Sequence, residues 1–163
     1  MGIKNYLIDG VSCAGKTTVA NELQLRGYQC IHGDRELAYW GNLTNDPPTE
    51  DNRIWMWNVK KVKELAKDQK HEVTFFCGGS RNSNSFVDLF DEVFILEIDL
   101  DTLNERLAAR PATEWGGTAS EGESFARLQH ATKEGFPKNA TTIDATQPLS
   151  SVVNAIIGKV KRV

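Results

Sequence analysis

The sequence predicts a three-layer α/β fold in which helices cover both faces of a five-stranded parallel sheet. Apolar runs of strand length alternate along the chain with segments that have the period of a helix. The run at residues 73–77 is apolar enough to be buried on both faces, as a central parallel strand is. A glycine-rich turn joins the first strand to the first helix. These features indicate a doubly wound sheet that binds ligands beyond the carboxyl ends of its strands.

The first part of the chain supplies two strands and one helix. Residues 3–9 form an apolar run that predicts the first strand, and residues 18–25 predict the helix after it. A second strand is expected over residues 28–32, ending at Gly33 and Asp34.

The middle of the chain is expected to be helical on either side of a polar connection. A short helix is predicted to begin in residues 36–40, and residues 42–50 form an irregular connection. Residues 53–70 have helical periodicity. The apolar side chains that recur there are Ile54, Trp57, Val62, Leu65 and Ala66. On such a helix Trp55 and Trp57 cannot face the same way, so one of them is available to line the ligand site, and the alternative is that both belong to the core.

The last part of the chain supplies two more strands and two helices. A fourth strand is expected over residues 93–98, and Asp99 then caps a helix over residues 100–109. A short fifth strand over residues 141–144 precedes a closing helix over residues 149–160.

The composition is that of one ordinary globular domain over residues 1–163, with 40% hydrophobic and 25% charged residues. A net charge of -3 gives no electrostatic reason to expect a nucleic-acid or membrane partner. No apolar run approaches the roughly 18 residues that span a bilayer, and we expect no signal peptide. Cys13, Cys30 and Cys77 lack a metal-binding spacing, so we expect a reducing, cytoplasmic setting. Either a monomer or a homodimer is compatible with the sequence.

The most specific motif is the turn at residues 10–17, Gly-Val-Ser-Cys-Ala-Gly-Lys-Thr. It matches G-x-x-x-x-G-K-[ST] at every fixed position and lies between a strand and a helix, where backbone N–H groups surround the phosphates of a nucleotide. Lys16 is expected to reach the β- and γ-phosphates, and the Thr17 hydroxyl is expected to bind Mg²⁺. The candidate nucleotide-binding residues here are Gly10, Ser12, Cys13, Ala14, Gly15, Lys16, Thr17 and Thr18.

Asp34 follows the second strand and is therefore expected at the same edge of the sheet as the phosphate loop. A carboxylate there could accept a hydrogen bond or a proton from an attacking hydroxyl, or hold Mg²⁺ through water. The alternative role, compatible with these, is an N-cap of a helix that begins at Arg35. No aspartate directly follows the third strand, so the Mg²⁺ shell is expected to use Thr17, phosphates and waters, with Asp34 or Asp9 in the outer shell.

Three arginines are candidate ligands of phosphate or of a nucleobase. Arg81 follows the third strand behind two glycines, which let the backbone approach a ligand closely. Arg106 and Arg110 are four residues apart and share one face of a helix. One guanidinium can stack on a nucleobase while the other forks onto the transferring phosphate oxygens. The alternative is that both form salt bridges with Glu105 or Glu114.

With these residues assembled, the chain resembles the small P-loop kinases, namely the nucleoside and nucleotide monophosphate kinases and the related shikimate and gluconate kinases. The segment 106–110 is similar to the R-x-x-x-R of adenylate kinases, which implies that Arg106 stacks on adenine and Arg110 contacts phosphate. Residues 143–149, Ile-Asp-Ala-Thr-Gln-Pro-Leu, are similar to their I-D-G-T-Q-P-V segment. That likeness implies that Ala145, Thr146 and Gln147 lie beside the base. The D-G-x-P-R segment of nucleotide kinases is absent.

The resemblance implies a three-layer P-loop NTPase fold with a short lid at about residues 111–124 and an acceptor-binding region at about residues 35–58. It also implies an ATP-dependent kinase that uses Mg²⁺ and transfers the γ-phosphoryl group to a small molecule, with a nucleoside or nucleotide as the expected acceptor. Lys16, Asp34, Arg81 and Arg110 are the candidate catalytic residues. The alternatives are a shikimate- or gluconate-type hydroxy-acid kinase, or a nucleotide-binding ATPase or switch that transfers nothing to a small acceptor.

Overall fold

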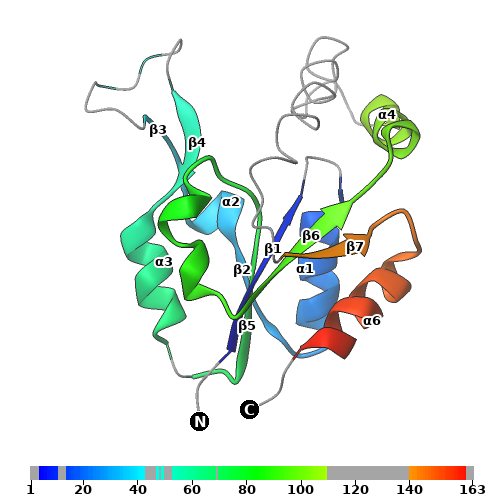
Figure 1. Ribbon diagram of the computed structural model, residues 1–163, viewed down its shortest axis with the longest axis horizontal. Coiled ribbons are helices and arrows are strands. Elements are labelled where there is room, and N and C mark those ends of the chain that lie inside the picture. The colour runs from blue at the N-terminus through cyan, green and yellow to red at the C-terminus, as the bar shows by residue number, and fades with distance from the viewer. Residues whose placement is uncertain are drawn as a thin grey trace.

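The computed structural model describes residues 4–10, 14–42, 47, 49, 53–68, 70–109 and 140–160. Its centre is a five-stranded sheet in the order β2-β5-β1-β6-β7, in which every neighbouring pair is parallel (Figure 1). The strands of this sheet are β1 (Lys4–Gly10), β2 (Gln29–His32), β5 (Val73–Cys77), β6 (Glu92–Glu97) and β7 (Thr141–Asp144). The predicted five-stranded parallel sheet is therefore confirmed.

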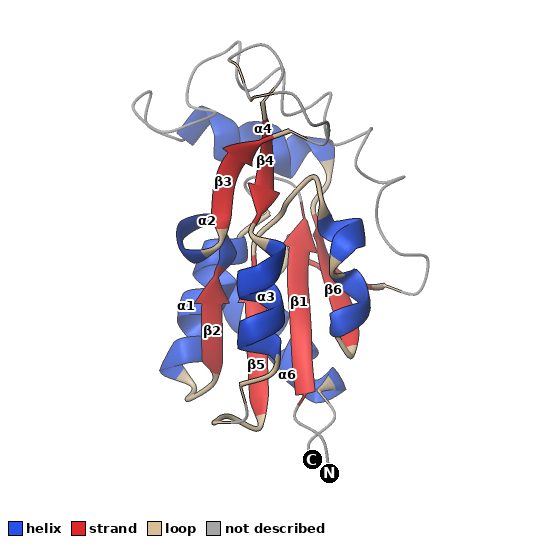
Figure 2. Cartoon of the chain, turned by 90° about the vertical axis from the view of Figure 1, so that its left-hand side faces the viewer, coloured by secondary structure: helices blue, strands red, loops and turns tan. Residues whose placement is uncertain are grey.

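Helices lie on both faces of the sheet, with α3 on one side and α1 and α6 on the other (Figures 1 and 2). Strand side chains alternate between the faces, so Tyr6 and Ile8 pack under α1 and α6 while Leu7 packs on the side of α3. The helices are α1 (Lys16–Leu25), α2 (Gly33–Glu36), α3 (Val59–Ala66), α4 (Leu100–Ala109) and α6 (Leu149–Lys159), with short 3₁₀ turns η1 (Ser83–Ser85) and η2 (Val87–Leu89). No helix among the described residues is long and apolar enough to cross a membrane.

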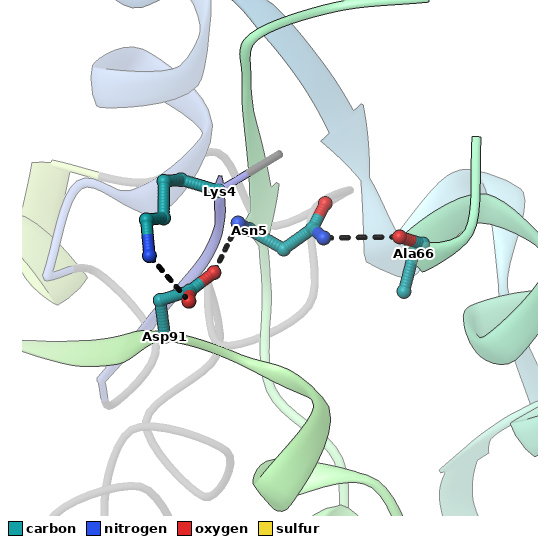
Figure 3. Close-up of polar contacts among 4 residues, drawn as sticks. All are labelled: Lys4, Asn5, Ala66 and Asp91. Carbon is teal, nitrogen blue, oxygen red and sulfur yellow. Dashed lines mark hydrogen bonds and ion pairs between the residues drawn. The ribbon is translucent and has the colours of Figure 1, made fainter. Parts of the chain in front are cut away.

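Polar contacts fix the amino end of the sheet, opposite the edge that carries the sequence motifs (Figure 3). Asp91 accepts hydrogen bonds from the backbone N–H of Asn5 at 2.8 Å and from Lys4 Nζ at 3.4 Å. The Asn5 side chain donates to the Ala66 carbonyl at 3.0 Å. These bonds connect β1 to the segment before β6 and to the end of α3.

The region between α2 and α3 differs from the predicted helices. Residues 38–41 and 54–57 form an antiparallel pair, β3 (Ala38–Gly41) and β4 (Ile54–Trp57), which we call the β3–β4 ribbon. Figures 1 and 2 show it extending beyond the carboxyl edge of the main sheet. The short apolar run Ile-Trp-Met-Trp is ambiguous between helix and strand, and pairing with a distant segment decides the outcome.

The predicted helix over residues 53–70 is correct only in its central part, because α3 covers Val59–Ala66. Asn58 is its N-cap, and the Asn58 side chain accepts a hydrogen bond from the Lys61 N–H at 3.1 Å. The helix predicted to begin in residues 36–40 is displaced to Gly33–Glu36. The remaining strands and helices that the sequence predicts are confirmed, and each of their ends differs from the prediction by no more than two residues.

Candidate functional site

The carboxyl ends of β1, β2 and β5 bring three candidate polar side chains to the two glycines that follow β5. A Cβ on Gly78 would lie 3.0 Å from Asp34 Oδ1. A Cβ on Gly79 would lie 2.7 Å from Asp9 Oδ1 and 3.5 Å from Lys16 Nζ. The absence of side chains at these two positions therefore lets carboxylates from β1 and from the end of β2 lie beside the backbone after β5.

The phosphate loop begins and ends with glycines in conformations that other residues rarely adopt. Gly10 has φ +151°, and a Cβ there would lie 2.6 Å from the Leu96 carbonyl oxygen of the adjacent strand. Gly15 has φ +98° and is the N-cap of α1. No side chain of the described residues caps this helix and its first turn has no acidic residue, so its first N–H groups are available to an anion. Val11, Ser12 and Cys13 lie outside the described residues.

Lys16 and Asp9 face the same stretch of backbone. Lys16 Nζ donates to the Gly10 carbonyl at 2.5 Å, and the Gly10 N–H donates to Asp9 Oδ1 at 2.7 Å. Burial raises the pKa of Asp9 to about 6 from its usual 3.8, although the positive charge of Lys16 and the Gly10 N–H oppose this rise. The carboxyl of Asp9 therefore changes its charge between mildly acidic and neutral pH, a few ångströms from the lysine of the loop.

Asp34 is exposed and lies in the first turn of α2. The helix begins at Gly33 with His32 as its N-cap, so the alternative role of Asp34 as an N-cap is wrong. The indole N–H of Trp55 donates to Asp34 Oδ1 at 3.2 Å. Asp34 thus connects the end of β2 to the β3–β4 ribbon, and its other oxygen faces no partner among the described hydrogen bonds.

The segment after β5 runs along the outer edge of β4. The Arg81 N–H donates to the Trp55 carbonyl at 2.9 Å, while its side chain is exposed. The buried Asn82 side chain accepts from the Trp57 N–H at 3.0 Å and donates to the Trp57 carbonyl at 2.9 Å. Asn82 therefore satisfies the backbone of β4 as a neighbouring strand would.

Trp57 is buried and packs at the ends of β2 and β5. Its ring stacks on Phe86 with centroids 5.5 Å apart and planes 4° apart. A Cβ on Gly33 would lie 2.0 Å from the Trp57 ring, and one on Gly78 would lie 2.8 Å from it. The indole therefore fills the space that side chains at the ends of β2 and β5 would need.

Two polar atoms near this packing, Trp57 Nε1 and Ser80 Oγ, are buried without a hydrogen-bond partner among the described residues. A buried unpaired polar group costs about 1–3 kcal/mol. A bound oxygen atom beside either group would be stabilised by the missing hydrogen bond.

On the opposite side of the phosphate loop, Arg106 approaches the loop after β7. Its Nη2 donates to the Ala145 carbonyl at 2.9 Å, and its Nη1 would lie 3.9 Å from a Cβ on Gly15. Asp144 orders the same loop by accepting hydrogen bonds from Thr146 and Gln147, which lower the pKa of this carboxyl. The structure thereby brings together Arg106, Ala145 and the start of α1, three candidates from distant parts of the sequence.

The remaining predicted site residues are either outside the described part of the chain or lie at the start of α1 and in the loop after β7. Arg110, Glu114 and the predicted lid at about residues 111–124 lie outside the described residues. Thr17 and Thr18 are exposed in the first turn of α1, directly after Lys16, and Ala14 is buried. Thr146 and Gln147 are exposed beside Asp144.

The structure adds residues that the sequence reasoning missed. Nothing in the sequence pattern indicated that Trp57 packs on Gly33 and Gly78 or that Asn82 pairs with β4. If residues 54–57 are taken as a strand, alternation of side chains places Trp55 and Trp57 on one face, and this pattern could have indicated their arrangement. The role of Asp144 in ordering its loop follows from the tendency of Asp to bond the backbone two residues on.

The donors at this edge fit Mg²⁺. They are a hydroxyl, Thr17, and two carboxylates, Asp9 and Asp34, and Mg²⁺ prefers oxygen ligands and retains several waters beside substrate phosphates. Among the described residues no three His, Cys, Asp or Glu side chains gather into a metal cluster. Thr17 would hold the cation directly, and the carboxylates would orient its waters.

Comparison with known families gives one match, a family model described as an AAA domain, over residues 7–129. That range contains the phosphate loop, Asp34, the β3–β4 ribbon and Arg106. No curated protein matches the sequence.

Comparison with solved structures finds small kinases at low identity. A gluconokinase from Sinorhizobium meliloti is 20% identical, covers 95% of this chain and 90% of its own, and superposes with a TM-score of 0.61. A shikimate kinase from Acinetobacter baumannii in complex with shikimate is 15% identical, with coverages of 98% and 96% and a TM-score of 0.61. A deoxyadenosine kinase from M. mycoides with bound dATP is 14% identical, with coverages of 94% and 97% and a TM-score of 0.55. The fold of small P-loop kinases is confirmed over nearly the whole chain.

Proposed function

Since the chain belongs to the AAA domain family and has the fold of small P-loop kinases, we propose that it is an ATP-dependent kinase of a small molecule. The observation that carries this proposal is that candidate phosphate-binding residues and a candidate acceptor-binding carboxylate lie close together at one edge of the sheet. The Lys16 ammonium, from the uncapped start of α1, lies near Gly79, and Asp34 lies beside Gly78. A phosphate donor and a hydroxyl acceptor bound to these two sets would face each other.

The phosphate loop would bind the polyphosphate of ATP. The free N–H groups of the first turn of α1 attract phosphate oxygens, and the positive end of the helix adds to this attraction. Lys16 would exchange its bond with the Gly10 carbonyl for the β- and γ-phosphates, because both partners accept hydrogen bonds from the same ammonium. Mg²⁺, when bound, would neutralise charge on the same phosphates. Arg106 and residues 145–147 would lie on the side of the adenine.

Asp34 would accept the hydrogen bond of the attacking hydroxyl, or its proton as the phosphoryl group is transferred. Its exposed position and its single described hydrogen bond, from Trp55, leave acceptor capacity on the carboxylate. The exposed guanidinium of Arg81 would contact the acceptor or its phosphate, and Arg110 would contact the transferring phosphoryl group. A nucleoside or nucleotide is the acceptor that we propose.

The experiment that tests the proposal measures ADP release with Mg²⁺, ATP and a panel of acceptors. The panel contains nucleosides, nucleoside monophosphates, gluconate and shikimate, and product formation is followed by mass spectrometry. We expect phosphorylated product from the unmodified protein and none above background from Lys16→Ala. ATP hydrolysis that no small acceptor changes, but that a partner protein stimulates, would favour the alternative of a nucleotide-dependent switch.

A hydroxy-acid kinase is the second enzyme that the fold accommodates. Phosphorylation of gluconate or shikimate without phosphorylation of any nucleoside or nucleotide would establish it, and the kinase proposal would stand with a different acceptor.

A further inference from the structure

We propose that the face of the β3–β4 ribbon carrying Trp40 and Trp55 binds the ring of the acceptor, so that the protein selects an aromatic heterocycle by stacking. This inference rests on the proposed kinase function and names the part of the site that chooses its acceptor. It assigns a specificity-determining role to Trp40, with Trp55 and Arg53 beside it.

The register of the ribbon places four residues on one face. Ala38 pairs with Trp57 and Trp40 pairs with Trp55, and side chains at these positions point to the same side because strand side chains alternate. Burial along this face is graded. Trp57 is 1% exposed, Trp55 is partly buried, and Trp40 is 48% exposed. The face therefore begins inside the core and ends at an indole that is about half exposed.

The same face contacts Asp34, the residue proposed to activate the acceptor. Trp55 donates its indole N–H to Asp34 Oδ1 at 3.2 Å, and its ring centroid lies 4.8 Å from that of Trp40. Trp55 thus lies between the carboxylate and the exposed ring. An acceptor whose hydroxyl reaches Asp34 would extend its other end along Trp55 toward Trp40.

Hydrogen bonds to the backbone hold the ribbon, and with it these side chains, in place. The Arg81 N–H bonds the Trp55 carbonyl, Asn82 bonds both backbone groups of Trp57, and the Asn58 N–H bonds the Leu37 carbonyl at 2.8 Å. A fixed aromatic surface loses little conformational freedom on binding, and this favours affinity. Trp40, which is exposed on this ribbon, is suited to base stacking.

Charge on this face also suits a nucleobase with phosphate or ribose attached. The guanidinium carbon of Arg53 lies 4.7 Å from the centroid of the Trp40 ring, as in a cation–π pair. Arginine planes stack on bases and bind phosphate oxygens. Gluconate and shikimate have no aromatic ring to stack, so the indole surface would contribute little to their binding, and this distinguishes the two acceptor classes.

The test compares Trp40→Ala with Trp40→Phe and with Tyr39→Ala. Tyr39 is the matched control, because it is 46% exposed on the same strand but points to the opposite face, where it pairs with Met56. Steady-state kinetics with Mg²⁺ and ATP give kcat and KM for each nucleoside. Calorimetry with the imido analogue of ATP present gives the nucleoside Kd without turnover, and binding of the analogue itself shows that each variant is folded.

We expect Trp40→Ala to raise the KM and the Kd of the best nucleoside about tenfold or more, because base–aromatic stacking carries about this much affinity. The KM of ATP and kcat should change less than threefold. Trp40→Phe should retain most of the affinity, and Tyr39→Ala should match the unmodified protein. Equal nucleoside affinity in Trp40→Ala and the unmodified protein, or an equal loss in Tyr39→Ala, would overturn the inference.

The outcomes separate this inference from the kinase proposal. Phosphorylation of gluconate or shikimate alone, unaffected by Trp40→Ala, keeps the kinase and overturns the ring site. Nucleoside binding that Trp40→Ala weakens, in a protein that phosphorylates nothing, keeps the ring site and overturns the kinase.

Discussion

The proposed nucleotide side of the sheet edge is held by backbone geometry and polar bonds, whereas the proposed acceptor side is held mainly by aromatic packing. On the nucleotide side, Gly10 and Gly15 adopt positive φ, and Asp144 orders its loop through hydrogen bonds. On the acceptor side, Trp57 fills the space over Gly33 and Gly78. The glycine conformations and the Asp144 bonds named for the first side are local in the sequence, whereas the Trp57 packing of the second side joins residues up to 45 positions apart, from Gly33 to Gly78. The two sides should therefore respond differently to substitution.

The largest effect is expected on the nucleotide side, from Lys16→Ala. We expect kcat to fall about 100- to 1000-fold or more, because the charge that stabilises the transferring phosphates is lost. Stability should change little, since Lys16 makes one described hydrogen bond, to Gly10. ADP release and thermal unfolding measure the two quantities. The control is Lys60→Ala on the exposed surface of α3, and equal turnover in Lys16→Ala and this control would contradict the assignment.

The acceptor side should instead show its sensitivity in folding, most clearly in Gly33→Ala. The added Cβ would overlap the Trp57 ring, so we expect the free energy of unfolding to fall by about 3 kcal/mol. The matched control is Gly158→Ala in α6, where a Cβ meets nothing within 4 Å. That substitution should raise stability by about 0.5–1 kcal/mol. Urea unfolding measures both, and changes of the same sign would refute this account of Trp57.

Asp9, which lies between the two sides, should make the stability of the protein depend on pH. Its pKa is about 6 in the folded protein and 3.8 when exposed, so the folded state binds the proton more tightly. The stabilisation from this proton is complete below about pH 4, is lost as the pH rises through 6, and corresponds to about 3 kcal/mol.

Asp9→Asn removes this ionisation. Without Mg²⁺ or nucleotide, we expect the stability of the variant relative to the unmodified protein to be about 1–3 kcal/mol greater at pH 8 than at pH 4. Urea unfolding at the two pH values gives the comparison. A difference that does not depend on pH would show that the carboxyl of Asp9 keeps an ordinary pKa.

The smallest effect is expected from Asp144→Ala. The loop that Asp144 orders would lose the bonds from Thr146 and Gln147, and we expect the KM of ATP to rise a few-fold with kcat nearly unchanged. Asp101→Ala, an exposed aspartate of α4, serves as the control. A larger change in the KM of the acceptor than in the KM of ATP would contradict the proposal that this loop lies beside the adenine of ATP.

The difference between the two sides also explains what the sequence could predict. The parallel sheet and the strand–loop–helix around residues 10–17 follow from patterns contained within about ten residues, because their causes are local. The expected helical conformation was wrong for residues 38–40 and 54–57, because the pairing of Ala38 with Trp57 depends on a contact between distant segments. The bond from Trp55 to Asp34 depends on this pairing too, and a helical interpretation could not reveal it.

The most direct test of the account is calorimetric titration with Mg²⁺ and the imido analogue of ATP. We expect binding at one site per chain with a Kd in the micromolar range typical of such substrates, weakened at least tenfold in Lys16→Ala. No heat of binding to the unmodified protein, or the same Kd in Lys16→Ala, would contradict the claim that residues 10–17 bind a nucleoside triphosphate.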